Sequence, residues 1–141
     1  MNADESWRNK VRNQDRTRRE ELNRMTEQVI GGAFTVSNEL GSGFLEKVYE
    51  NAMAHELSKA GIRVEQQYPI QVYYDGIVVG NYVADLLVED CVLVELKTIK
   101  ALGNVEMAQC LNYLKATDLR VCLLLNFGRP RVEVKRIVHD F

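Results

Sequence analysis

An acidic and a basic side chain, Glu95 and Lys97, stand two residues apart near the end of the apolar segment "CVLVELKT", residues 91–98. The segment is typical of a buried β-strand, and residues two apart on a strand point to the same face. Because an isolated charge costs several kcal/mol to bury, each side chain needs a partner. The pair therefore indicates either a structural ion pair or a site that binds a charged group.

The preceding segment, "NYVADLLVED", is apolar except for Asp85 in its middle. If 77–88 and 91–98 form a hairpin whose paired residue numbers sum to 180, Asp85 lies directly opposite Glu95. A two-residue turn at 89–90 would instead give a sum of 179 and place the two acids on opposite faces. A site that uses both acids therefore requires an odd-numbered loop or a bulge.

Two facing carboxylates repel each other and need a positive charge between them. Lys97 could supply that charge alone, as a buried salt bridge. A divalent cation is the alternative, because the carboxylates of Asp85 and Glu95 and the backbone carbonyl of Leu96 offer the oxygen ligands that Mg²⁺ prefers. Lys97 beside the metal could orient or activate water or neutralise a developing oxyanion. This arrangement suits metal-assisted hydrolysis of phosphodiester bonds.

The rest of the sequence predicts the elements that would position these residues. Apolar residues recur at three- and four-residue steps over about 18–40 and about 43–60, which predicts two helices, with Ser42 as N-cap of the second. A region rich in Val, Ile and Tyr follows, with turn signals between its runs. The expected strands are 62–68, 70–74, 77–88 and 91–98, with Pro69 dividing the first two or marking a bulge.

A third helix is expected over about 104–117, followed by the strands "RVCLLLNF" and "VEVKRIV" on either side of the turn "GRPR". The first of these strands is apolar on both faces, as is typical of a strand inside a sheet covered by helices. The order helix, helix, strand meander, helix, strand, strand predicts an α+β fold with helices on the faces of the sheet.

Length and charge limit the classes of protein. With 141 residues the chain fits one domain, which we expect to span 18–141 behind a polar tail at 1–17. The net charge is −2, yet both ends are basic and the middle is acidic. A basic rim could attract phosphates while an acidic centre holds cations, or these charges could simply be solvated. We expect neither a signal peptide nor a membrane span, since the sequence shows no apolar leader and no long apolar run. The three cysteines all lie in apolar segments and suit a reducing cytoplasm, where we expect the protein.

The spacing of Asp85, nine residues, then Glu95-Leu96-Lys97 resembles the D…ExK signature of the PD-(D/E)XK nuclease superfamily. Members have a helix, then a strand meander that carries the acids, then a helix and a strand, which is the order expected here. Ala84 stands before Asp85 where many members have proline. The resemblance implies a restriction-endonuclease-like core with a mixed central sheet, flanking helices, and Mg²⁺ or Mn²⁺ as cofactor.

Gly43-x-x-Glu46-x-x-Tyr49 in "GFLEKVYENAM" resembles the GxxExxY protein family, a small-domain branch of the same superfamily. The resemblance covers roughly residues 20–138 and implies that Glu46 approaches the metal site. Without it, an acid near a helix start is more simply explained by the helix dipole, and Tyr49 by core packing.

Gln109 and Tyr113 lie one turn apart on the third expected helix, and "QCLNY" resembles the QxxxY motif of helicase-coupled exonucleases in the superfamily. The resemblance implies that Gln109 points at the active site and that Tyr113 helps hold DNA. Lys100, Arg129 and Arg131 could contact phosphates, although exposed basic residues beside turns are commonly just solvated.

Two hypotheses follow. In the first, the protein is a nuclease in which Asp85, Glu95 and Glu46 hold the metal, Lys97 assists the chemistry and Gln109 orients the site. Nucleic acid is then the partner, with DNA favoured over RNA. In the second, the chain is a non-catalytic module of nuclease fold that binds nucleic acid or a protein, which the overall acidity favours slightly. A homodimer is compatible with either hypothesis.

Overall fold

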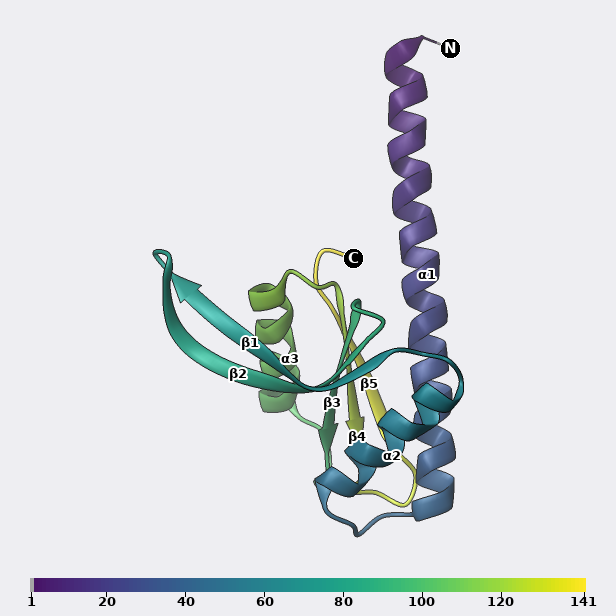
Figure 1. Ribbon diagram of the computed structural model, residues 1–141, viewed down its shortest axis with the longest axis vertical. Helices are drawn as coiled ribbons and strands as arrows, with labels where there is room; N and C mark the ends of the chain where they lie inside the picture. The colour runs from purple at the N-terminus through teal and green to yellow at the C-terminus, as the bar shows by residue number, and fades with distance from the viewer. Residues whose placement is uncertain (1) are drawn as a thin grey trace.

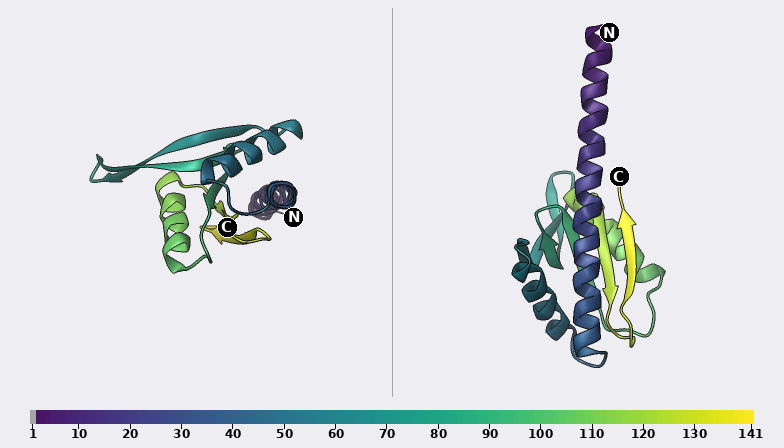
Figure 2. Two further views of the ribbon diagram at one scale, coloured as in Figure 1. Left: turned by 90° about the horizontal axis from the view of Figure 1, so that it is seen from below. Right: turned by 90° about the vertical axis from the view of Figure 1, so that its right-hand side faces the viewer.

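The structure, a computed structural model, describes residues 2–141 (Figure 1). Five strands form one mixed sheet, with α3 on one face and α1 and α2 on the other (Figure 2). The predicted α+β class, with a mixed central sheet and flanking helices, is confirmed. The elements are α1 (Ala3–Leu40), α2 (Glu46–Lys59), β1 (Val64–Tyr74), β2 (Ile77–Val88), β3 (Val92–Lys97), α3 (Asn104–Thr117), β4 (Val121–Asn126) and β5 (Glu133–Val138).

Helix α1 begins much earlier than the apolar spacing predicted. The Asn2 side chain caps it by accepting a hydrogen bond from the Glu5 backbone N–H (2.9 Å), and Asp4 and Glu5 stabilise the first turn through the helix dipole. Residues 3–17, expected as a polar tail, form an exposed extension of this helix, and buried residues start only at Leu22. The apolar pattern thus marked where the helix meets the sheet, not where it begins.

Helix α2 begins later than predicted, and Ser42 is not its N-cap. Leu45 occupies that position, and no side chain caps the helix. The chain before it turns through Gly41 and Gly43, whose φ angles of 66° and 113° favour glycine. The Tyr49 hydroxyl donates to the Gly41 carbonyl (2.6 Å), so the turn is held from within the helix rather than by a capping serine.

Strand β1 is continuous through Pro69, which pairs with Val83 on β2. It is an edge strand in the order β1-β2-β3-β4-β5, so a residue without a backbone N–H need not interrupt a ladder. Strands β3 and β4 are parallel and joined through α3; the other neighbouring pairs are antiparallel. Helix α3 and the last two strands lie where the sequence predicted them.

Two apolar clusters fill the space on either side of the sheet. One joins α1 and α2 to the sheet, and the other joins α3 to it. The buried strand residues alternate between the two clusters along β3 and β4, as expected for central strands covered on both faces. No helix within residues 2–141 is both long enough and apolar enough to cross a membrane.

Candidate active site

Strands β2 and β3 separate at the two acids that the sequence singled out. Their paired residue numbers sum to 180, as in Leu86 with Val94, and the loop between Val88 and Val92 has the odd length that was required. Beyond Leu86, β2 continues beside β1 while β3 continues beside β4. Asp85 and Glu95 therefore face each other across the opening of a fork between two strands.

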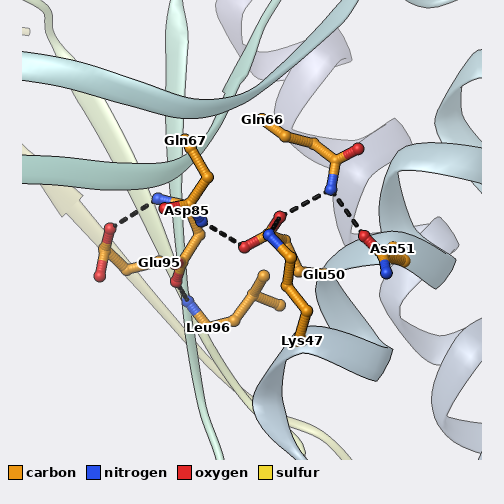
Figure 3. A network of polar contacts seen from close by, with 8 residues as sticks. All are labelled: Lys47, Glu50, Asn51, Gln66, Gln67, Asp85, Glu95 and Leu96. Carbon is orange, nitrogen blue, oxygen red and sulfur yellow. Dashed lines mark hydrogen bonds and ion pairs between the residues drawn. The ribbon is translucent and has the colours of Figure 1, made fainter.

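Where the strands separate, backbone N–H groups lose the partners that a ladder would supply. The carboxylate of each acid accepts a hydrogen bond from one of these N–H groups on the opposite strand. The Asp85 backbone N–H donates to Glu95 Oε1 (3.0 Å), and the Leu96 backbone N–H donates to Asp85 Oδ2 (2.7 Å). Leaving a buried donor unpaired would cost about 1–3 kcal/mol. These reciprocal bonds explain how two adjacent strands tolerate both acids, and they fix both carboxylates at the fork (Figure 3).

At the same point, the side chains of the paired strands β1 and β2 change from one apolar cluster to the other. Leu86 packs in the cluster of α1 and α2, whereas Ala84, two residues earlier on β2, packs in the cluster of α3. On β1, Gln67 lies between the residues that pair with Leu86 and Ala84, and it has a left-handed φ of 57°. Alternate residues of a regular strand share a face, so the two strands must twist sharply at Gln67 and Asp85 for Leu86 and Ala84 to point to opposite faces of the sheet. Such backbone strain in a residue other than glycine clusters at functional sites.

Burial raises the pKa of both acids, and at Glu95 the Asp85 carboxylate adds to the effect. The Glu95 side chain is 4% exposed, and burial together with the Asp85 carboxylate raises its pKa from 4.5 to about 8. Burial also raises the pKa of Asp85, against the opposing effect of the Leu96 N–H bond. Without a bound cation, the fork disfavours carrying both negative charges. Strongly raised carboxyl pKa values are more frequent at functional sites than elsewhere.

Lys97 ends β3 beside these acids without closing a salt bridge to them. Its ammonium group opposes the rise in the pKa of Asp85 and of Glu95 without reversing it. Among the ion pairs of residues 2–141 within 4.0 Å, however, none includes Lys97. The alternative of a structural Glu95–Lys97 ion pair is therefore not formed. The Lys97 main chain is held instead, since its carbonyl accepts from the Phe127 N–H (2.8 Å).

A further carboxylate, Glu50 on α2, lies near the fork and was missed by the sequence analysis. It is 3% exposed and accepts hydrogen bonds from Lys47 Nζ (2.7 Å), Gln66 Nε2 (2.6 Å) and Gln67 Nε2 (2.5 Å), as Figure 3 shows. Both glutamines belong to β1, so this network joins α2 to β1 at the point where that strand twists. The four-residue spacing between Glu46 and Glu50 puts both on one helix face and could have drawn attention to Glu50.

Glu46, the helical acid to which the resemblance assigned a metal role, is exposed in the first turn of α2. Burial and the Asp85 carboxylate raise its pKa while Lys97 lowers it, so these groups lie within electrostatic reach. In the described part of the chain, no three Asp, Glu, His or Cys side chains lie together as a metal-binding cluster. The structure thus brings Asp85 and Glu95 together but does not add Glu46 to a shared ligand set.

Helix α3 presents Gln109 and Tyr113 on one face, as their spacing predicted. Gln109 Nε2 donates to the Tyr113 hydroxyl (3.0 Å). Burial, and then the Glu95 carboxylate, raise the pKa of Tyr113 to about 12. The tyrosine ring also packs against Tyr82 of β2, with the ring centroids 5.7 Å apart. Tyr113 therefore lies between the fork and the outer part of β2, with Gln109 bonded to its hydroxyl.

The three basic residues expected to contact phosphates all lie on exposed loops. Lys100 follows β3, and Arg129 and Arg131 follow β4. The Arg129 guanidinium is 4.0 Å from Glu133, and that of Arg131 lies over the Phe34 ring at 5.1 Å. Both arginines therefore have partners within the chain while remaining exposed to solvent.

The loops that carry these basic residues are fastened to each other. The buried Asn126 side chain accepts from the Ile99 N–H (3.0 Å) and donates to the Ile99 carbonyl (2.9 Å). A Cβ on Gly128 would lie only 2.3 Å from the Ile99 carbonyl oxygen, so only glycine allows this approach. The chain just beyond Lys97 is thus held against the loop that follows β4.

The donors at the fork suit a hard divalent cation. Asp85 and Glu95 each use one carboxylate oxygen for a backbone N–H, which leaves the other oxygen of each for an ion. Mg²⁺ is commonly held by one or two carboxylates and keeps several waters, so two carboxylates are sufficient. The side chain of Leu96 is buried in the cluster of α1 and α2, so only its backbone lies at the fork.

Comparison with known proteins identifies the superfamily of the chain. The family model of the PD-(D/E)XK nuclease superfamily matches residues 23–137, and the chain belongs to that superfamily. No curated protein matches it.

Two solved structures share the fold. An alkaline exonuclease (LHK-Exo) from Laribacter hongkongensis aligns with a TM-score of 0.50 at 18% identity, over 67% of this chain and 56% of its own. The structure of SSO0001 aligns with a TM-score of 0.53 at 15% identity, over 67% of this chain and 50% of its own. The chain thus spans about half the length of these two proteins, and at such identities the likeness concerns the fold alone.

Proposed function

We propose that this protein is a Mg²⁺- or Mn²⁺-dependent nuclease that hydrolyses phosphodiester bonds of nucleic acid, with DNA favoured over RNA. The observation that carries the proposal is the strand fork, where Asp85 and Glu95 each accept a hydrogen bond from the backbone of the opposite strand and burial raises the pKa of both. The neighbouring Lys97 closes no ion pair that would neutralise them. Nucleases of this superfamily generally use divalent metals.

In this proposal Asp85 and Glu95 bind the ion, with the backbone carbonyl of Leu96 as a third ligand and Glu46 acting from α2. The ion would supply Lewis-acid stabilisation of the phosphoryl oxygens. Lys97 orients the attacking water or neutralises charge that develops in the transition state, since its ammonium forms no ion pair with residues 2–141 and lies within electrostatic reach of both acids. Gln109 orients the groups at the site.

Substrate binding is assigned to residues around the fork. Tyr113, whose pKa the Glu95 carboxylate helps to raise, contacts the nucleic acid strand, and Lys100, Arg129 and Arg131 contact its phosphates. Arginine and lysine on fixed loops bind phosphate through charge-assisted hydrogen bonds. A cytoplasmic location completes the proposal, because the three cysteines are free thiols, as a reducing compartment would keep them.

The test is cleavage of labelled single-stranded, duplex, branched and RNA substrates in the presence of Mn²⁺. We expect cleavage by the wild-type protein and its loss, by at least about a hundredfold, in Asp85→Asn. The matched control is Asp75→Asn, because Asp75 is exposed at the turn between β1 and β2 and its left-handed φ of 51° suits asparagine. If the wild-type protein cuts no substrate, or Asp85→Asn cuts as well as the control, the enzyme proposal is wrong.

The non-catalytic module remains the second candidate, and one observation favours it. Both carboxylates at the fork already have backbone partners, and the described residues assemble no cluster of three ligands. A module of this kind would bind nucleic acid or protein equally well with and without Mn²⁺. Metal-dependent cleavage that needs Asp85 would exclude it.

A further inference from the structure

Strands β1 and β2 extend beyond the rest of the sheet as a two-stranded arm, residues 68–84, with its tip at Asp75 and Gly76 (Figures 1 and 2). Its base packs on α3 through the buried Ile70 and Ala84. Toward the tip the side chains are exposed. A two-stranded ribbon is only marginally stable by itself in water, so the outer part of the arm gains stability if something covers it.

The arm is apolar and nearly uncharged. Asp75 is the one charged residue between 68 and 84. Of the fifteen exposed large hydrophobic side chains in residues 2–141, seven lie on the arm and two more on α3. Together these nine expose on the order of 1,000 Å², compared with roughly 800 Å² per partner in a standard protein interface. This area is spread over both faces of the arm, because successive residues of a strand point to opposite faces. Such a concentration marks a binding surface rather than scattered exposure.

A groove of about 930 Å³ runs between the arm and α3. Val79 and Tyr82 form part of its arm side, and Val105 and Tyr113 part of its helix side, while Lys115 is its one charged lining residue. Val105 is 81% exposed at the start of α3. The groove is large enough to receive apolar side chains of the size that project from the arm tip, where Tyr74 is 70% and Ile77 66% exposed.

We propose that this surface, the arm together with the exposed face of α3, is the contact between two copies of the chain. The arm tip is an apolar projection, and the groove beside it is an apolar hollow. In a dimer with two-fold symmetry, the arm tip of each copy would fill the groove of the other. Strand β1 is also a free sheet edge beyond Pro69, and an edge can pair antiparallel with its own copy.

Charge favours a second copy over nucleic acid. Binding of a phosphate backbone rests on lysine and arginine, and this surface offers Lys115 alone. A strongly charged surface would repel its own copy, whereas this one is close to neutral and therefore compatible with itself. The groove shares Gln109 and Tyr113 with the proposed active site, but the dimer is inferred from shape and charge and not from nuclease activity.

The test is the molar mass of the full chain by light scattering and sedimentation, up to about 100 µM. We expect a dimer for the wild-type protein. In Val79→Lys, where the side chain is 60% exposed, the dissociation constant should rise at least about a hundredfold, because two apolar contacts would each acquire a charge. Trp7→Lys is the control, since Trp7 is 67% exposed on α1, away from the arm, and should leave the dimer intact.

Ile77→Lys provides a second variant at the tip, and circular dichroism checks that both variants fold. A wild-type chain that stays monomeric at the highest concentration overturns the proposal, and so does a dimer that both folded lysine variants retain. Ultraviolet crosslinking of a single-stranded oligonucleotide to Tyr82 in a monomeric wild-type protein would assign the groove to nucleic acid instead.

Discussion

Replacing Glu95 with glutamine should stabilise the metal-free protein at alkaline pH. Glu95 has a pKa of about 8 in the folded chain against an ordinary value of 4.5. The folded state therefore binds this proton more tightly than the unfolded chain does, and stability falls as the pH rises between these two values. The shift implies a loss of about 4 kcal/mol between about pH 5 and about pH 8.5.

Glutamine keeps an oxygen that can accept the Asp85 N–H and never ionises, so Glu95→Gln should remove this loss. Urea unfolding at both pH values should show a gain over the wild type of about 2–4 kcal/mol at about pH 8.5 and little gain at about pH 5. The exposed Glu65 on β1 provides the control Glu65→Gln, which should change stability little at either pH. Equal stability changes at the two pH values would refute the electrostatic account of the fork.

Three further substitutions test the surroundings of the site. Tyr49→Phe removes the hydrogen bond to the Gly41 carbonyl and should cost about 1–2 kcal/mol in urea unfolding, because the turn before α2 loses its tie. Gly128→Ala should cost about 3 kcal/mol in the same assay, because the added carbon meets the Ile99 carbonyl oxygen. Glu50→Gln turns an acceptor for three donors into a group that is partly a donor, and should lower thermal stability by about 2 kcal/mol in differential scanning calorimetry.

The sequence predicted the parts of the fold that depend on local pattern. Helix α3 was expected over the residues where it occurs, and the strand meander followed from Val, Ile and Tyr content and turn signals. The pairing of β2 with β3 followed from one condition, an odd loop, and the structure meets it between Val88 and Val92. Asp85 and Glu95 could be identified because a charge within an apolar strand needs a partner.

The features that the sequence did not reveal depend on contacts between distant segments. The left-handed backbone of Gln67 interrupts the alternation of side chains between the two faces of β1. The Gln67 side chain is held by a hydrogen bond to Glu50 on α2. Glu50 itself looked like one more polar residue on a helix. Ser42 has the chemistry of a helix cap, but Tyr49 holds the turn instead. The exposed start of α1 has no apolar period, because nothing in the described chain covers it.

Metal binding at the fork is tested most directly by a crystal structure of the protein grown or soaked with Mn²⁺ near pH 8 and examined by anomalous scattering. We expect an anomalous peak between the carboxylates of Asp85 and Glu95 in the wild type, and none there in Asp85→Asn. A well-ordered fork without a peak, or Mn²⁺ bound only elsewhere on the molecule, would contradict it.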